Sequence, residues 1–272
     1  ELWVANSGSR SLSVIDGVTS RVVDSVAVGS TPTSLAVSAT GGKVYVANRG
    51  ADSLTVVEAA TRQVVARLAT GDNPYHVAWH PVLDRVYVPC FGGNELTVVD
   101  CAADTVLARV GVGFGACFAA VDTVRNEVWV ANRLGDNVSV VNCATNQPVA
   151  TVNAGGSPWA LALNPTSSRL YCLLEDDDAV GVISTVTRGI SLVGVGTGPR
   201  CVTWCPGINK VYVGNYDSDD VTLIDGANNA VLGTIRTGIG DKPQALLWNP
   251  SAGKVYCANY GDASVSVIGT VE

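Results

Sequence analysis

The chain has 272 residues with a formal net charge of −7 at pH 7, and only 15% of its residues are charged. Nucleic-acid binding requires a basic surface, so this negative charge, with only four lysines, argues against a nucleic-acid partner. No apolar run approaches the roughly 18 residues that a membrane helix needs, so we expect no direct insertion into a membrane.

A short apolar pattern, typified by VYVAN, recurs seven times along the chain. Successive copies begin 42, 42, 42, 42, 41 and 44 residues apart. A repeat of this length, rich in β-branched residues and glycine, is typical of a β-propeller with about four strands per blade. The copies lie at 2–6, 44–48, 86–90, 128–132, 170–174, 211–215 and 255–259.

Each repeat predicts four antiparallel strands, A to D from the propeller axis outward. In the second repeat, B lies at 44–48, C at 54–57 and D at 64–70, and the next A strand follows a Gly-x-x-Pro turn at 74–79. Apolar residues on both faces of A and B indicate strands packed between neighbouring blades. Trp3, Tyr45 and Trp129 are therefore expected to be buried between blades.

The chain opens on strand B of the first blade and closes on strand C of the seventh, which predicts 26 strands. We predict an all-β, seven-bladed β-propeller with four-stranded antiparallel blades, incomplete first and last blades, and a single domain over residues 1–272. Because open rings leave unpaired strand edges, we expect the chain to be truncated at its N-terminus. The 41-residue step predicts one residue lost from the C–D turn at 184–188, and the 44-residue step two residues gained at 238–242.

These motifs resemble those of the YVTN-repeat β-propellers, a family of archaeal surface-layer and bacterial exported proteins. VYVAN at 44–48, followed by LTVVE at 54–58 and a Gly-x-x-Pro turn, is similar to the blade signature of that family, and the similarity extends over essentially the whole chain. Repeats three and five depart from it, with Cys90 and Leu174 in place of the final Asn. The resemblance implies an extracellular, cell-surface or periplasmic location. It implies no catalytic residue and no cofactor, because the family shares none.

The D–A loops and B–C turns are expected on one face, called the top. The position after the D–A proline varies from blade to blade on a regular scaffold, which predicts either a binding pocket at the mouth of the channel or side chains that plug it. Trp159 is the one tryptophan predicted in a loop, with an aromatic body and a polar handle suited to binding. The candidate binding residues at this mouth are Tyr75, His76, Phe118, Trp159, Arg200 and Gln244.

Two acidic runs, 175–178 and 217–220, are predicted in B–C turns of adjacent blades. They are interpreted as solvated turns, as a docking surface for a basic partner, or as a Ca²⁺ site, since Ca²⁺ takes six to eight oxygen ligands. In this register only Arg200 lies close enough to offset their charge. Exchanging the four candidate carboxylates for amides is expected to leave folding intact or slightly improved. These candidates are Asp177, Asp178, Asp219 and Asp220.

Histidine and cysteine chemistry is limited. His76 and His80 lie four residues apart on one predicted strand and cannot chelate one metal; His76 is a candidate base, although a surface role is favoured. Pairing of Cys90 with Cys117, or of Cys172 with Cys201, is an alternative to buried free thiols, which the sequence favours.

The sequence thus favours a noncatalytic binding or scaffold propeller that contacts a protein or cell-envelope component through an acidic top. The alternative is an enzyme or enzyme subunit of lyase, lactonase or quinone-dependent dehydrogenase type, with its site at the top mouth.

Overall fold

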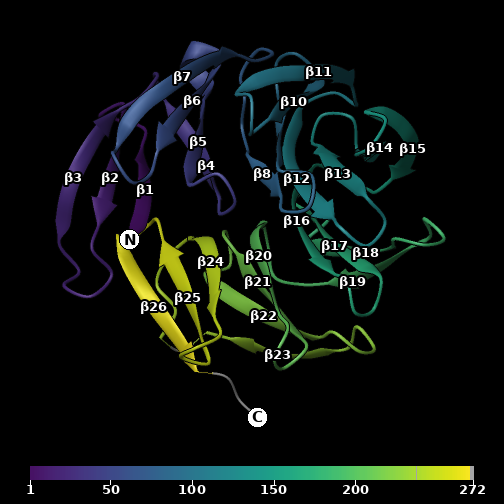
Figure 1. Ribbon diagram of the computed structural model, residues 1–272. Coiled ribbons are helices and arrows are strands. Elements are labelled where there is room, and N and C mark those ends of the chain that lie inside the picture. The colour runs from purple at the N-terminus through teal and green to yellow at the C-terminus, as the bar shows by residue number, and fades with distance from the viewer. Residues whose placement is uncertain (237, 270–272) are drawn as a thin grey trace. The chain divides into compact units, whose positions relative to one another are not determined.

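The protein is a seven-bladed all-β propeller, as predicted, and its first and last blades have three strands. The computed structural model describes residues 1–236 and 238–269. Each sheet is antiparallel, with strands in chain order from A to D (Figure 1). The chain divides into two compact units, residues 1–135 with 139–151 and residues 136–138 with 152–272.

The first unit holds blades one to three and most of blade four. Blade one lacks strand A, and blade two carries one 3₁₀ turn, Arg49–Ala51, in its B–C connection. The strands are β1 (Leu2–Asn6), β2 (Ser11–Ile15) and β3 (Val22–Ala27); β4 (Pro32–Ser38), β5 (Lys43–Asn48), β6 (Ser53–Glu58) and β7 (Gln63–Ala69); β8 (Ala78–His80), β9 (Arg85–Cys90), β10 (Glu95–Asp100) and β11 (Thr105–Gly111); and β12 (Ala116–Asp122), β13 (Glu127–Asn132), β14 (Asn137–Asn142) and β15 (Gln147–Asn153).

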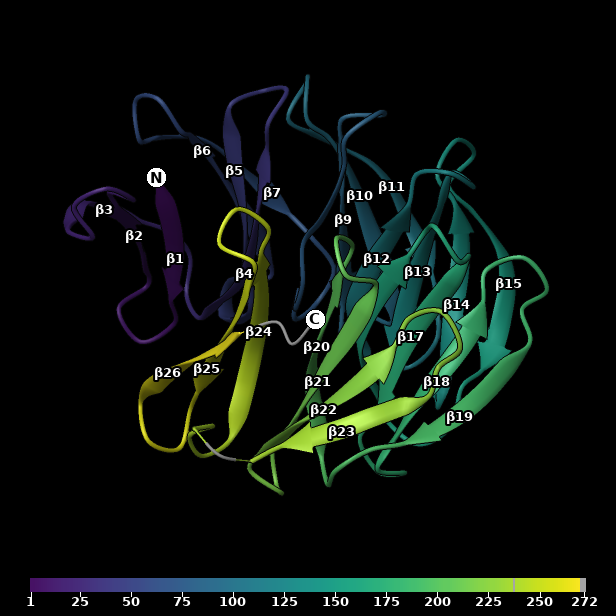
Figure 2. The ribbon, with the colours of Figure 1, turned by 90° about the horizontal axis from the view of Figure 1, so that it is seen from below.

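The second unit holds blades five, six and seven, and the described part of blade seven has no strand D. Figure 2 shows these three sheets from below. The strands are β16 (Pro158–Asn164), β17 (Arg169–Leu174), β18 (Ala179–Ser184) and β19 (Ile190–Gly194); β20 (Pro199–Cys205), β21 (Lys210–Asn215), β22 (Asp220–Asp225) and β23 (Val231–Ile235); and β24 (Pro243–Asn249), β25 (Lys254–Asn259) and β26 (Ser264–Gly269). Within the described ranges, no helix is long and apolar enough to cross a membrane.

The core lies between blades, on strands B and C. Tyr45 and Trp129 are fully buried, and Trp3 is partly buried against a cluster that includes Leu12 and Val44. The predicted burial of these three aromatic residues is confirmed. Their burial follows from the β-branched and aromatic character of both faces of strand B.

The final Asn of the VYVAN motif has a structural role. Asn48 is fully buried, and its Nδ2 donates to Thr55 Oγ1 at 2.8 Å on the next strand. Its Oδ1 accepts from the Gly29 N–H at 3.0 Å, which joins the preceding D–A loop to this blade. A Cβ on Gly29 would meet the Asn48 side chain at 2.6 Å, so the close approach requires glycine there. The same Asn-to-hydroxyl bond links Asn6 to Ser13, Asn132 to Ser139, Asn215 to Thr222 and Asn259 to Ser266.

In blades three and five the final Asn of strand B is replaced, and its contact with strand C changes accordingly. In blade three, Cys90 replaces Asn and its Sγ lies 3.5 Å from Thr97 Oγ1, so a weaker polar contact remains. In blade five, Leu174 replaces Asn and Gly181 replaces the hydroxyl residue. A Cβ on Gly181 would meet Ile190 Cδ1 at 2.9 Å and Leu174 Cδ1 at 3.4 Å, so glycine there makes room for these two apolar side chains. An apolar pair therefore replaces the hydrogen bond in blade five.

The residue lost in blade five lies in strand D, which corrects the predicted position. The C–D turn at 184–188 is intact, because the Arg188 N–H donates to Ser184 O at 3.0 Å, as Arg62 does to Glu58 O at 2.8 Å. In blades one, two, three and six a β-bulge interrupts the pairing of strands C and D. In blade five the pairing is continuous from Ala179↔Gly194 to Ile183↔Ile190, so the missing residue is the bulge.

Candidate functional site

The B–C turns hold the D–A loops of the following blades. A turn residue with positive φ, Asp or Asn, uses its side-chain oxygen to accept a backbone N–H from the loop. Both segments therefore lie on the predicted shared face of their blades. The pairs are Asp52 with Asn73 N (2.8 Å), Asn94 with Gly115 N (2.9 Å), Asp136 with Ser157 N (3.0 Å), Asp178 with Gly198 N (2.9 Å) and Asp219 with Lys242 N (2.8 Å).

These contacts divide the four candidate carboxylates by role. Asp178 and Asp219 hold loops through one oxygen each, and Asp177 accepts from the Gly156 N–H at 2.7 Å. Asp220 is buried, accepts from Asn215 Nδ2 at 2.7 Å and lies 3.3 Å from Arg236 Nε. The expectation that only Arg200 offsets the acidic runs is therefore wrong.

Asp220 differs from the other three, because an amide there would remove the charge of a buried carboxylate that contacts the exposed Arg236. By contrast, Asn94 already performs the loop-holding role in blade three, so amides suit positions 178 and 219. Among the described residues, no group of three or more His, Cys, Asp or Glu side chains is arranged to hold a metal ion.

A row of aromatic and cationic side chains lies at the loop ends of the second unit. The Arg200 guanidinium lies 5.0 Å from the Trp159 ring centre and 4.8 Å from that of Tyr216. Lys242 Nζ lies 5.3 Å from the same Tyr216 ring. Such contacts are electrostatically favourable because the faces of aromatic rings are negative. Arg200 also forms an ion pair with Glu175 at 2.6 Å.

Sequence reasoning found Trp159 and Arg200 but missed Tyr216, Lys242 and the role of Glu175. Trp159 lies within β16, not in a loop, which corrects the prediction. Glu175 and Tyr216 both directly follow strand B, at the same place in the repeat. The residue directly after strand B differs from repeat to repeat, as does the residue after the D–A proline. This variation could have indicated Glu175 and Tyr216 as candidate site residues.

The first unit holds a similar arrangement around Tyr75. Its ring lies 5.2 Å from the Arg49 guanidinium carbon and 6.2 Å from the Phe91 ring centre. Arg49 and Phe91 also directly follow strand B of their blades, so the same repeat positions meet in both units. Gln244, another candidate, lies in β24 with an exposed side chain.

His76 is fixed by the neighbouring blade. Its ring stacks on Phe118 with centres 3.8 Å apart, and its Nδ1 accepts from the Ala119 N–H at 3.4 Å. This bond leaves the ring proton on Nε2. The side chain is partly buried, and the resulting desolvation lowers the pKa of His76 to about 4. A neutral imidazole whose Nδ1 is occupied is poorly placed to act as a general base.

We expect stability to fall as pH drops from about 6.5 toward 4, because unfolded His76 then binds a proton that the folded state excludes. When the pH falls from about 7 to 4.5, the free energy of unfolding of the native chain should decrease. In a His76→Phe variant this decrease should be smaller, by on the order of 2 kcal/mol. Urea unfolding at both pH values measures the difference. Equal losses in the two proteins would contradict this assignment.

The cysteines carry no cross-link in the described part of the chain. All eight are buried thiols, so the favoured interpretation is confirmed and neither candidate pair is a disulfide. Burial raises the pKa of the Cys101 thiol to about 12, which keeps it protonated and unreactive.

Comparisons with known proteins support the fold. A family model for YNCE-like beta-propellers matches residues 1–87. A chain of Kuenenia stuttgartiensis hydrazine synthase is similar in structure, with a TM-score of 0.84 and 19% sequence identity over 99% of this chain and 92% of that chain. Both findings indicate a β-propeller family. No curated protein matches significantly. At 19% identity the structural likeness shows the fold alone, and propellers host unrelated functions.

Proposed function

We propose that this chain is a noncatalytic binding or scaffold propeller of the YVTN-repeat type, in an exported or cell-surface protein. The partner is a protein or cell-envelope component with basic groups, bound through the top loops of blades five and six. One observation carries the proposal: Asp176, Asp177, Asp217 and Asp219 are exposed in those turns, while hydrogen bonds hold the turns in place.

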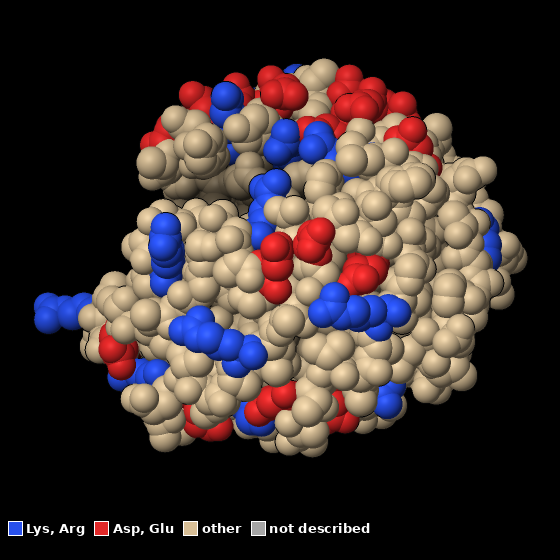
Figure 3. Space-filling model, turned by 90° about the horizontal axis from the view of Figure 1, so that it is seen from above, with Lys and Arg blue, Asp and Glu red and all other residues tan. Residues whose placement is uncertain are grey.

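Preorganisation is the physical reason for this choice. Backbone and hydroxyl donors occupy one oxygen of Asp176, Asp177 and Asp219, so these side chains lose little further freedom when a cation approaches. Carboxylates in blades five and six outnumber the nearby cations Arg200, Arg236 and Lys242. A basic partner would therefore relieve repulsion between like charges. Figure 3 shows another side of the molecule, where acidic and basic side chains both occur and the acidic ones are most numerous along one margin.

The enzyme alternative draws on the likeness to a hydrazine synthase chain, which supports a fold and no residue role. The neutral, hydrogen-bonded His76 does not favour it.

Exchange of Asp176, Asp177, Asp217 and Asp219 for Asn tests the proposal. A fluorescent lysine decapeptide should bind this variant about tenfold more weakly at low salt, because four exposed charge contacts contribute roughly 0.3–0.5 kcal/mol each. Fluorescence anisotropy measures the affinity, and added salt should reduce the difference.

The matched control removes the same charge from the C–D turns, with Asp16, Asp100 and Asp225 changed to Asn and Glu58 to Gln. Asn142 already occupies the corresponding place in blade four, so these changes should be tolerated. Equal weakening by both variants would show that net charge alone governs binding. A basic partner captured from native extract should be lost with the first variant and retained with the control.

A further inference from the structure

The outer D strands of most blades carry features that discourage pairing with another chain. A free strand edge exposes unpaired N–H and C=O groups, and proteins protect it with bulges, charges or proline. The bulges described above protect β3, β7, β11 and β23. Charged Asp24, Arg67 and Arg109 add to this in β3, β7 and β11, and β15 contains Pro148.

Strand β19 has none of these features. Its sequence, ISLVG, contains no charge and no proline, and its pairing with β18 is unbroken. It is the outer strand of its sheet, and Leu192 is 62% exposed. Gly189 O accepts from Ser184 N, and Val195 N donates to Asp178 O, so the odd-numbered positions face β18. The N–H and C=O groups of Ile190 and Leu192 therefore point outward.

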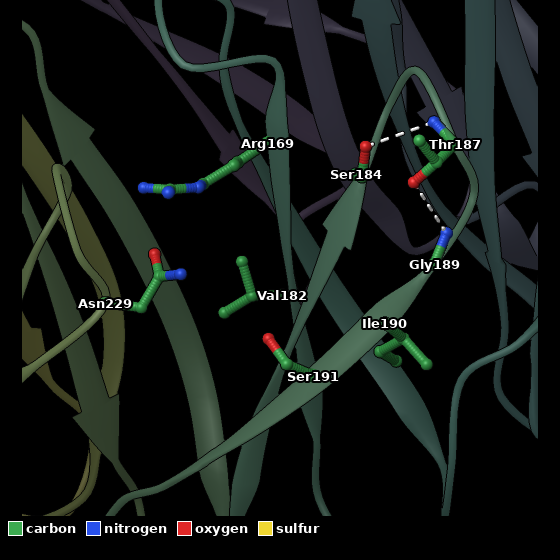
Figure 4. A pocket seen from close by; sticks show the side chains of 8 residues that line it. All are labelled: Arg169, Val182, Ser184, Thr187, Gly189, Ile190, Ser191 and Asn229. Carbon is green, nitrogen blue, oxygen red and sulfur yellow. Dashed lines mark hydrogen bonds between the residues drawn. The ribbon is translucent and has the colours of Figure 1, made fainter.

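A pocket of about 280 Å³ lies beside this edge. Arg169, Val182 and Ser191 line it on one face of the sheet, and Asn229 lines it from the next blade (Figure 4). Tyr171, Val182 and Ser191 are aligned across three strands, which sets a common side-chain face for the sheet at this point. A strand added beyond β19 would place alternate side chains on the pocket face.

The pocket contains a cation without an ion-pair partner among the residues that the structure describes. Arg169 Nη1 donates to Gly226 O and Ala227 O, both at 2.8 Å. Lys43, which also begins a strand B, forms an ion pair with Asp104 at 2.7 Å. Asn229 occupies the place that corresponds to Asp104, so Arg169 lacks the carboxylate that Lys43 has. An incoming carboxylate would complement this charge.

We propose that β19 binds an extended acidic segment of a partner protein by strand addition, with a Glu or Asp side chain directed into the pocket toward Arg169. Backbone hydrogen bonds to Ile190 and Leu192 supply affinity, and the carboxylate supplies specificity. This surface lies on the outer edge of blade five and is independent of the acidic top loops.

The test uses a phage-displayed library of random dodecapeptides selected on the full chain. Selected peptides should contain an acidic residue within an alternating extended segment, and changing that residue to its amide should weaken binding about tenfold. Leu192→Pro removes an outward N–H that strand β18 does not use, so it should weaken binding at least tenfold while the fold persists. Leu192→Ala keeps the N–H and should stay within about threefold.

Hydrogen exchange on the unmodified protein provides a second readout, since the bound peptide should protect the Ile190 and Leu192 amides. The proposal is overturned if Pro and Ala at 192 weaken binding equally, if acidic peptides are not enriched, or if no peptide protects β19. Dimerisation of the chain alone, abolished by Leu192→Pro in sedimentation, would identify a second copy as the occupant and also overturn it.

Discussion

Replacing Asn48 with Ala should lower the free energy of unfolding by about 3 kcal/mol. The side chain is fully buried, and its removal leaves the Gly29 N–H without its observed partner and Thr55 Oγ1 with only the bond from Arg67 Nη1 at 3.3 Å. Each unsatisfied buried group costs roughly 1–3 kcal/mol, and a small cavity adds to this. Urea unfolding monitored by tryptophan fluorescence measures the change.

Asn6 provides the matched control, because it occupies the same repeat position in the three-stranded first blade. It donates to Ser13 Oγ at 2.9 Å and is only partly buried. Asn6→Ala should therefore cost about 1 kcal/mol. If both substitutions destabilise the chain equally, neither burial nor the contact with Gly29 increases the contribution of this asparagine to stability.

Replacing Asp104 with Ala should destabilise the protein by about 2 kcal/mol. Asp104 joins blade three to blade two, because its carboxylate binds Lys43 Nζ at 2.7 Å and the fully buried Tyr45 hydroxyl at 2.9 Å. Loss of a partly buried ion pair is costly, but Cys101 O accepts from both groups and limits the loss. Thermal and urea unfolding measure it.

Two further variants separate charge from hydrogen bonding at this contact. Asp104→Asn keeps an acceptor for Tyr45 and should recover about half of the loss. Asn229→Ala removes the equivalent contact with the Tyr171 hydroxyl at 3.1 Å, where no ion pair exists, and should cost about 1 kcal/mol. A cost for Asn229→Ala that equals that of Asp104→Ala would rule out a major contribution from the Lys43 ion pair.

The candidate site was only partly predictable for a physical reason. Repeat register placed Trp159 and Arg200 at the same position, directly after the D–A prolines of adjacent blades, and they do lie together. Tyr216 and Lys242 reach the same row from a B–C turn and a D–A loop. The direction of a turn side chain depends on the segment that packs against it, and a repeat alignment does not contain that information.

The sequence by itself determined the number of blades, the order of strands and the burial of Tyr45 and Trp129. The pattern of apolar residues that forms each strand is local, and it recurs in every repeat. Only the tertiary structure decided that Asp178 and Asp219 hold loops, that Asp220 is buried, and that the residue missing from blade five is the bulge of β19. These outcomes depend on which donors another strand or loop brings within about 3 Å of a side chain. An Asp in an exposed turn and an Asp bonded to a neighbouring loop look alike in sequence, and packing between blades distinguishes them.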